Sequence, residues 1–327
     1  MRSKPSKAGI VGAGHVGAEL AYALVLLRSC DQVILFDRTL SKAQAQAWDI
    51  EDTIPLLSEM DLLPSDQYEE LADCDVIAVT VGTPADKGED RLALLGRNVD
   101  IIRSVIEELD RVAPNAIIIV VSNPVDVLTR IAIETSSRPE NLILGSGTVL
   151  DTARLKYQLG KKLNVSKQDV YVYVIGEHGN SEFIAWSSAS VGLVGLAEFL
   201  ILGETTLENI KEDYVEFTRQ RGYSISDRKG YTSYGIATVI TQLIKAILRD
   251  EKQIFTVSVK ADAKYDIGNK VVLGLPCIIG EQGIERKLVL PRNREEQRAL
   301  LASATKLNEA YNSLLVRGEQ VSMTSES

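Results

Sequence analysis

The first 145 residues of the sequence alternate short apolar runs with longer amphipathic stretches. Runs such as Val76–Val81 are rich in β-branched residues, as strands covered on both faces of a sheet are. Strands that alternate with helices in this way form parallel βαβ units. The pattern therefore predicts an α/β fold in which residues 1–145 form a doubly wound parallel sheet. We expect its strands at 8–11, 33–36, 76–81, 116–121 and 142–144, and a helix at 98–113.

The pattern changes after Gly145 and predicts a C-terminal α+β domain at 146–317. A chain of 327 residues exceeds the usual size of one hydrophobic core, which also favours two domains. The expected helices are 151–163, 208–221, 234–248 and 294–316, and the expected strands are 170–175, 254–259, 274–279 and 287–290. We expect the segment 234–250 to pack back on the first domain, and residues 318–327 to form a disordered polar tail.

A glycine-rich turn follows the first expected strand. Gly12, Gly14 and Gly17 form the pattern GxGxxG, which permits a tight turn and close approach of the backbone to a pyrophosphate. Asp37 ends the strand at 33–36, where a carboxylate accepts hydrogen bonds from a ribose diol. A purely structural turn is the alternative, but the two features together predict a Rossmann fold that binds NAD. The carboxylate of Asp37 would repel a 2′-phosphate, which disfavours NADP.

The composition argues against several classes of partner. The chain carries 45 acidic against 36 basic side chains and no basic block, whereas nucleic-acid binding requires clustered Lys and Arg. We read no signal peptide at 1–7, and the apolar stretch at 20–27 is too short to span a membrane. Cys30, Cys74 and Cys277 lack CxxC spacing, which favours reduced thiols in the cytoplasm. We therefore expect a cytoplasmic protein with no nucleic-acid, membrane or metal partner.

Histidine is scarce, which limits acid–base chemistry near neutral pH to His15 and His178. His15 occupies a variable position of the glycine-rich turn, which places it beside the cofactor phosphates. His178 lies between Glu177 and Gly179, on a loop after the strand at 170–175. It is either a turn residue or the proton carrier that hydride transfer between a nicotinamide and an alcohol carbon requires.

Several further motifs occur along the chain in the order found in a known family. They are Thr80-Val81-Gly82, Asp90-Arg91-Leu92, Gly96-Arg97-Asn98, Ser122-Asn123-Pro124-Val125-Asp126, Leu150-Asp151-Thr152-Ala153-Arg154 and Gly176-Glu177-His178-Gly179. Together with the glycine-rich turn, they resemble the motifs of the L-lactate/L-malate dehydrogenase family over residues 7–316. The resemblance is greater to its L-2-hydroxy acid branch, which includes enzymes of the L-lactate and L-2-hydroxyisocaproate dehydrogenase types.

The resemblance implies roles for the polar groups. It makes His178 the general acid and base, with Asp151 on its other ring nitrogen and Arg91 polarising the reacting carbonyl. Asp151 and Arg154 are also spaced to share a helix face, and a planar guanidinium suits bidentate binding of a carboxylate. The implied substrate-binding residues are Arg154, Asn123, Ala85 and Thr232, and the implied cofactor-binding residues are Gly12, Gly14, His15, Val16, Gly17, Asp37, Thr80, Gly82, Asn98, Val121 and Asn123. Taken alone, Arg91 would be a solvated surface charge and Asn123 a turn residue.

The substrate is implied only as a class, a small 2-oxo or 2-hydroxy carboxylic acid. Family members that use malate carry Arg at the position of Ala85, and typical lactate enzymes carry Gln there. Alanine offers no charge to a second carboxylate, and Gly222 and Gly235 are small where a wall could stand. We expect reversible hydride transfer between NADH and pyruvate or a larger apolar 2-oxo acid such as 4-methyl-2-oxopentanoate.

Two alternatives stay open: malate dehydrogenase and, in a different class, a non-catalytic NAD-binding or structural protein. The resemblance also implies a homodimer or homotetramer, about which the residues themselves say nothing.

Overall fold

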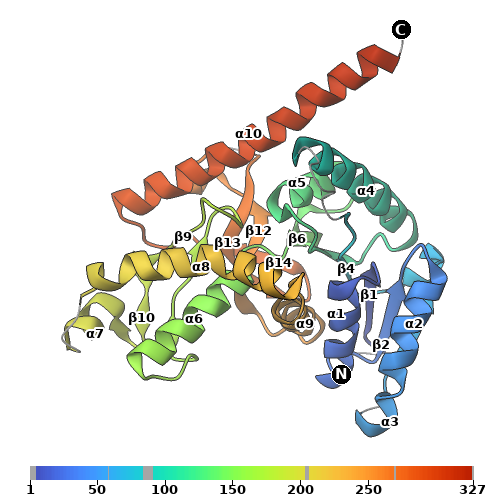
Figure 1. Ribbon diagram of the computed structural model, residues 1–327, viewed down its shortest axis with the longest axis horizontal. Coiled ribbons are helices and arrows are strands. Elements are labelled where there is room, and N and C mark those ends of the chain that lie inside the picture. The colour runs from blue at the N-terminus through green and yellow to red at the C-terminus, as the bar shows by residue number, and fades with distance from the viewer. Residues whose placement is uncertain (1–4, 58, 84–90, 203–205, 269, 326–327) are drawn as a thin grey trace.

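A computed structural model describes residues 5–57, 59–83, 91–202, 206–268 and 270–325. Within these ranges the largest element is a nine-stranded sheet with the strand order β14-β13-β12-β6-β5-β4-β1-β2-β3 (Figure 1). Its strands are β1 Lys7–Val11, β2 Gln32–Phe36, β3 Asp61–Ser65, β4 Val76–Val79, β5 Ile117–Val120, β6 Ile143–Gly145, β12 Gln253–Lys260, β13 Val272–Gly280 and β14 Gly283–Lys287.

The strands from β3 to β6 are parallel, and the winding reverses at β1, which lies between β2 and β4. The connecting helices are α1 His15–Leu26, α2 Leu40–Glu51, α3 Ile54–Leu57, α4 Arg91–Val112 and α5 Val125–Thr135. Every residue of β4 and β5 is buried, as their β-branched composition predicts. The predicted doubly wound parallel sheet is confirmed, and its reversal point opens a crevice at the carboxyl ends of the strands.

The three C-terminal strands extend this sheet instead of forming a separate one. β12 runs antiparallel to β6, and Ser258 pairs with Gly145 at the junction. A Cβ atom on Gly145 would lie 2.3 Å from Oγ1 of Thr129, so the two halves meet where only glycine fits. β14 begins at Gly283, earlier than the strand predicted at 287–290, because a tight turn with positive φ at Gly283 reverses the chain directly after β13.

The other helices of the C-terminal half are α6 Val149–Leu163, α7 Leu196–Leu202, α8 Glu208–Lys229, α9 Tyr234–Leu248 and α10 Arg294–Ser325, with short 3-10 turns η1 Tyr68–Leu71, η2 Glu140–Leu142, η3 Trp186–Ser188 and η4 Ala263–Tyr265. α9 packs along α1 of the first half. Most of its buried residues belong to one hydrophobic core that includes strands from both halves. A smaller cluster, which includes Leu155, Val170 and Leu196, joins α6 and α7 to the short strands between them.

The single strand expected at 170–175 is two short strands. β7 Val170–Tyr171 pairs with β10 Ser190–Val191, which also pairs with β11 Val194–Gly195, whereas β8 Val174–Ile175 pairs with β9 Phe183–Ile184. The alternation of buried and exposed side chains is the same for one strand or two. Only the pairing partners, which lie elsewhere in the chain, divide the segment.

The last helix is longer than the sequence indicates. α10 continues through Ser325, so the expected disordered tail at 318–327 is helical over 318–325. Gly318 costs only about 1 kcal/mol inside a helix, and no proline follows it. The end of α10 projects away from the rest of the molecule in Figure 1.

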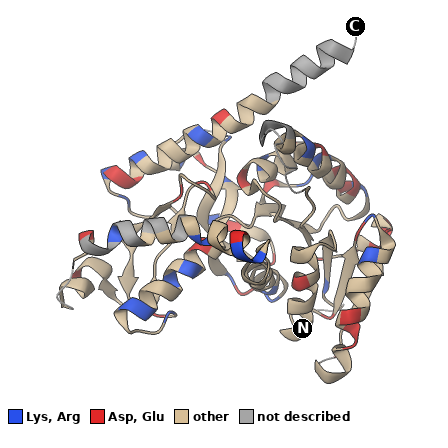
Figure 2. Cartoon of the chain, viewed as in Figure 1, with Lys and Arg blue, Asp and Glu red and all other residues tan. Residues whose placement is uncertain are grey.

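Acidic and basic side chains are interspersed over the described elements (Figure 2). Among the described residues, none of the helices combines the length and the apolar character that crossing a bilayer demands.

Candidate active site

A cavity of about 450 Å³ lies at the carboxyl ends of the central strands. Val16 lines it at the start of α1, Asn123 after β5 and Ser146 after β6. The wall also includes the start of α6, the loop after β8, α8, the segment before α9, and positions of α4, α9 and α10. Ligands of doubly wound sheets bind at this edge, where the winding reverses.

The glycine-rich turn at one end of the cavity has the backbone geometry that its motif predicts. Gly12 has a φ of +111°, which favours glycine, and a Cβ atom on Gly17 would lie 1.8 Å from the carbonyl oxygen of Gly12. A Cβ atom on Gly14 would meet nothing within 4 Å, so the space before α1 is open. No side chain caps α1 or brings an acid into its first turn. The N–H groups there can therefore bind a pyrophosphate.

Asp37 lies at the end of β2 and accepts three hydrogen bonds. They come from the N–H groups of Ala13 and Thr39, at 2.9 and 3.1 Å, and from Nζ of Lys42 at 3.1 Å. Burial alone would raise the pKa of Asp37, but these donors hold it below its usual value. The group is a charged acceptor beside the glycine-rich turn, as recognition of a ribose diol requires.

The other residues expected to contact the cofactor divide into two groups. Val16, Val121 and Asn123 line the cavity. Thr80 instead donates its hydroxyl to the carbonyl oxygens of Val11 and Gly12, and so supports the turn from behind. Asn98 also supports the neighbouring backbone. Its side chain lies against Gly82, and its Oδ1 accepts the N–H of Thr83 at 3.0 Å. The ring of His15 stacks on Tyr231 with 3.9 Å between centroids.

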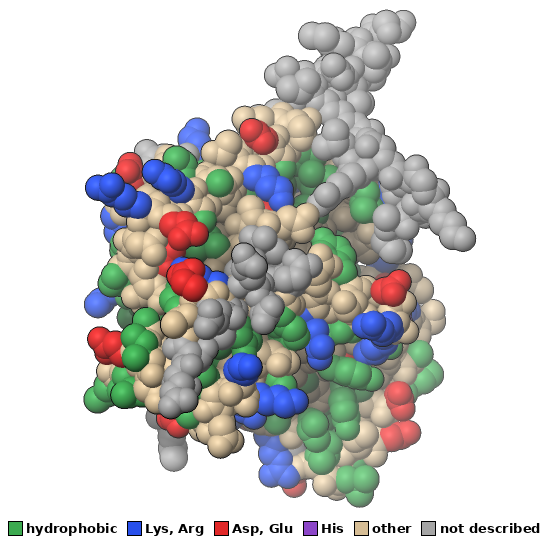
Figure 3. Space-filling view, turned by 60° about the vertical axis from the view of Figure 1, so that its left-hand side comes forward, with side chains coloured by type: hydrophobic (Ala, Val, Ile, Leu, Met, Phe, Trp, Pro, Cys, Tyr) green, Lys and Arg blue, Asp and Glu red, His purple; other side chains and the backbone are tan. Residues whose placement is uncertain are grey.

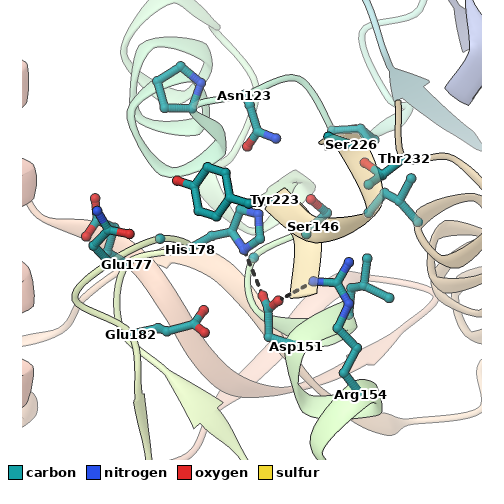
Figure 4. A pocket seen from close by; sticks show the side chains of 18 of the residues that line it. Asn123, Ser146, Asp151, Arg154, Glu177, His178, Glu182, Tyr223, Ser226 and Thr232 are labelled. Carbon is teal, nitrogen blue, oxygen red and sulfur yellow. Dashed lines mark hydrogen bonds and ion pairs between the residues drawn. The ribbon is translucent and has the colours of Figure 1, made fainter. Parts of the chain in front are cut away.

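His178, Asp151 and Arg154 form a chain of contacts on the cavity wall (Figure 4). Nδ1 of His178 lies 2.7 Å from Oδ2 of Asp151, and Nη1 of Arg154 donates to Oδ1 of the same carboxylate at 3.0 Å. Asp151 and Arg154 share one face of α6, while His178 comes from the loop after β8. The side chain of Asp151 is 2% exposed and that of His178 is 29% exposed, so the ring can reach a bound molecule.

The pKa values of this pair follow from their contacts. Burial alone would lower the pKa of His178, but Asp151, with help from Asp126 and Glu182, raises it to about 9. Burial would raise the pKa of Asp151, and the contacts with His178 and Arg154 hold it below its usual value. At neutral pH the pair is therefore an imidazolium bonded to a carboxylate, which can give a proton to a bound oxygen atom.

Asp126 holds the backbone of the loop that carries His178. Its Oδ2 accepts the N–H of His178 at 2.7 Å, and its Oδ1 accepts the hydroxyl of Ser258 at 2.6 Å. Burial raises the pKa of Asp126 to about 6. Asp126 belongs to the motif at 122–126, but its position there indicates no role, because an acid in the first turn of a helix is common.

α10 holds the other side of the same loop. The N–H of Glu177 donates to Oγ of Ser303 at 2.6 Å, and Nζ of Lys306 lies 2.8 Å from Oε2 of Glu177. A Cβ atom on Gly176, whose φ is +99°, would lie 2.8 Å from the Ser303 hydroxyl. Ser303 and Lys306 were not predicted as site residues, because helical periodicity identifies the apolar face of α10 and not the contacts of its polar residues.

Comparison with known proteins agrees with this architecture. Residues 6–145 match the NAD binding domain of lactate/malate dehydrogenase, and residues 148–315 match its alpha/beta C-terminal domain. The chain belongs to the lactate/malate dehydrogenase family. The family identified from the motifs is thus confirmed, and with it the NAD cofactor, which the open glycine-rich turn and Asp37 fit.

Members of the family with sequences similar to this chain include two clostridial proteins. L-lactate dehydrogenase of Clostridium botulinum (strain Loch Maree / Type A3) is 37% identical over 310 residues, which cover 94% of this chain and 96% of the relative. The protein of the same name from Clostridium perfringens (strain ATCC 13124) is 36% identical over 308 residues, which cover 93% of this chain and 96% of the relative.

Two solved structures of the family are similar to this fold. A lactate dehydrogenase, MGS-M5, from a Medee basin deep-sea metagenome library superposes with a TM-score of 0.91 at 32% identity, and covers 94% of this chain and 98% of its own. The minor L-lactate dehydrogenase of Enterococcus mundtii, in a ligand-bound form, has a TM-score of 0.90 at 31% identity, with the same coverage.

Some of the residues expected to bind the substrate line the cavity, and others are not described by the structure. Asn123, which precedes a cis peptide bond to Pro124, and Thr232 line the cavity with Arg154. Ala85 lies outside the described residues, and Arg91 begins α4 with a side chain that is likewise not described. Ser146, Tyr223 and Ser226 also line the cavity and carry no motif that would have identified them (Figure 4).

One expectation about the cavity wall is wrong. Gly235 does not border the described cavity, because a Cβ atom there would lie 3.0 Å from Cδ1 of Leu150, which already fills that space. Gly222 does border it, with Nη1 of Arg154 3.7 Å from the position of an added Cβ atom.

Proposed function

We propose that this dehydrogenase catalyses the reversible reduction of a 2-oxo acid to an L-2-hydroxy acid with NADH. The observation that carries the proposal is the contact chain of His178, Asp151 and Arg154 beside the glycine-rich turn. Reduction of a carbonyl next to a carboxylate needs a proton donor and a cation for the carboxylate in one site. The names of the relatives, L-lactate dehydrogenases, support the same reaction class.

His178 acts as the proton carrier in this proposal. The glycine-rich turn and Asp37 would hold the dinucleotide, which would supply the hydride as NADH and accept it as NAD in the reverse direction. Nε2 of His178 donates a proton to the carbonyl oxygen, while Nδ1 stays bonded to Asp151, which holds the ring in one orientation. Because the pKa of His178 is raised to about 9, the ring is charged and ready to donate at neutral pH. Oxidation of the hydroxy acid needs the neutral ring and is favoured above this pKa.

Arg154 binds the substrate carboxylate. Asp151 holds Nη1 of Arg154, and Arg154 lines the cavity. The guanidinium group is therefore already in position before a substrate carboxylate binds. Asn123 donates its amide to the substrate oxygen, and Thr232, which also lines the cavity, contacts the substrate. By the resemblance to the family, Arg91 at the start of α4 has the role of polarising the carbonyl bond.

The substrate is pyruvate or a larger apolar acid such as 4-methyl-2-oxopentanoate. Gly222 supports the larger acid, since any side chain there would extend into the cavity beside Arg154. Ala85 supports it as well, because alanine offers no charge to a second carboxylate of oxaloacetate. A roomy site still binds pyruvate, at a loss of about 1–3 kcal/mol for each unfilled methylene-sized space.

The test is kcat/KM for pyruvate, 4-methyl-2-oxopentanoate, phenylpyruvate and oxaloacetate, each with NADH. We expect turnover of the apolar 2-oxo acids and a value for oxaloacetate lower by about a hundredfold, the effect of leaving one carboxylate unpaired. A preference for oxaloacetate would support the malate dehydrogenase alternative instead. No NADH oxidation with any of the four acids would support a non-catalytic NAD-binding protein.

We also propose that the chain forms a homodimer or homotetramer. Trp48 of α2 and Leu56 of α3 are 60% and 84% exposed, and Leu26 and Leu27 are exposed at the end of the adjoining α1. Hydrophobic side chains also gather in patches on the face seen in Figure 3. Exposed apolar patches favour contact with a second copy, and light scattering after gel filtration would detect the oligomer.

We also propose a cytoplasmic location for the protein. Its three free, buried cysteines support this proposal.

A further inference from the structure

Glu182 is a buried acid beside the proton carrier that no motif identifies. It lies four residues after His178, lines the cavity, and is 3% exposed. A carboxylate oxygen of Glu182, one of Asp151 and a ring nitrogen of His178 all lie within 4.8 Å of one another. Figure 4 shows the Glu182 side chain directed toward the other two groups.

The local backbone does not require a glutamate at this position. The N–H of Glu182 closes a turn on the carbonyl oxygen of Gly179, a contact that any residue other than proline can make. Burying a carboxylate is costly unless opposite charge stabilises it. A positively charged His178 ring contributes to that stabilisation, and the carboxylate in turn stabilises the charge on the ring.

The other charged groups around His178 have different contacts. Asp151 bonds directly to the ring and also to Arg154, and Asp126 faces the backbone N–H of His178 rather than its ring. The acid next to His178 in the chain, Glu177, is bound to Lys306 of α10. Glu182 is thus, besides Asp151, a carboxylate with an oxygen within 4.8 Å of a ring nitrogen of His178 in the described structure.

We propose that Glu182 is a positioning residue that acts through His178, keeping its ring protonated and so extending 2-oxo acid reduction to higher pH. This inference rests on the proposed function of His178. The direction of the effect is set by charge. An anion near the ring raises the pKa of His178, and reduction is retained below that pKa and lost as pH rises through it. Removing the anion therefore moves the loss of activity to lower pH.

The kinetic test is the pH profile of kcat/KM for reduction of a 2-oxo acid by Glu182→Gln at saturating NADH. A charge at this distance shifts a pKa by about one unit, so the alkaline limb should move about one unit lower while activity below it stays similar. Glu182→Asp keeps the charge and should stay closer to the wild-type profile. Glu198→Gln, on the exposed side of α7, is the matched control and should leave the profile unchanged.

A second measurement does not depend on turnover. The chain has only two histidines, so NMR titration can follow the His178 imidazole directly, with the His15 signals as an internal reference. The midpoint for His178 should fall by about one unit in Glu182→Gln, and the His15 signals should be the same in both proteins. Glu182→Met carries the same expectation and places no amide without a hydrogen-bond partner in the buried site, with NADH binding as the check on folding.

An unmoved His178 midpoint and alkaline limb would overturn the role of Glu182. So would a variant that loses activity equally at every pH, because that pattern indicates only a structural role. If the wild-type protein reduces no 2-oxo acid but its His178 midpoint still falls in the variant, the proposed function fails while the charge contact between Glu182 and His178 stands.

Discussion

The two ends of the cavity are built in different ways. At the dinucleotide end, the turn from Gly12 to Gly17 and Asp37 belong to one βαβ unit. The N–H groups bound to Asp37 come from residues no more than 24 positions away, and Thr80 is the more distant support. At the acid–base end, the loop that carries His178 is held by Asp126, 52 residues away, and by Ser303, 126 residues from Glu177. Local backbone geometry makes the first end, whereas packing of distant segments makes the second.

Replacing the two histidines tests this difference most strongly. His178→Gln should lower kcat by roughly a thousandfold, because loss of a positioned acid–base group removes a factor of 10²–10⁴. NADH binding, measured by fluorescence titration, should be retained. His15→Gln should keep most of the activity, because its ring stacks on Tyr231 and faces no reacting group. The reverse pattern would contradict the assignment of the proton carrier.

Arg154→Lys should have the next largest effect. Lysine cannot make the bidentate contact with a carboxylate, so kcat/KM for the 2-oxo acid should fall roughly a hundredfold. The NADH affinity should stay the same, since the dinucleotide end is not altered. Arg111→Lys is a matched control, because that arginine contacts only exposed acids at the surface among the described residues. An Arg154→Lys enzyme as active as the wild type would place the substrate carboxylate elsewhere.

Ser303→Ala tests whether α10 contributes to the acid–base end. The change removes the acceptor for the Glu177 N–H, and a buried donor left without a partner costs about 1–3 kcal/mol of the free energy of unfolding. We expect a lower Tm and a kcat reduced about tenfold. Thr305→Ala, on the exposed side of the same helix, should change neither quantity. A Ser303→Ala protein with wild-type kcat would show that the loop holds its position without this contact.

The smallest effect on kcat is expected at the dinucleotide end. Asp37→Ala removes one charged acceptor, so the affinity for NADH should fall about tenfold, a loss near 1.4 kcal/mol. The kcat at saturating NADH and the KM for the 2-oxo acid should not change. Comparing NADH with NADPH in the wild-type protein checks the assignment, since a clear preference for NADPH would contradict it.

The fold could be predicted well where the pattern is local. The bounds of α9 agree with those expected from its apolar face, and β4 and β5 occur where β-branched runs indicate them. The parallel strand β3 was not predicted, because Asp61–Ser65 contains no β-branched residue. The prediction failed for the segment at 170–175, because its two halves pair with different strands. It also failed to show that β12 joins β6, since nothing local indicates which edge a strand will meet.

The candidate site divides in the same way. Motifs with fixed spacing identified the glycine-rich turn, Asp37, and the residues Asp151, Arg154 and His178. Asp126, Ser303 and Glu182, which hold or surround His178, lie in segments whose own patterns have simpler explanations, such as a helix start or a solvated loop. Their contacts depend on how separate elements pack.

The sequence by itself determined the features that depend on a few neighbouring residues. Only glycine adopts the φ of Gly12 without strain, and a spacing of three residues places Asp151 and Arg154 on one helix face. The tertiary structure alone decided the charge on His178 at neutral pH. That charge depends on burial and on distances to carboxylates from α5, α6 and the loop after β8, because electrostatic energy follows separation in space and not along the chain.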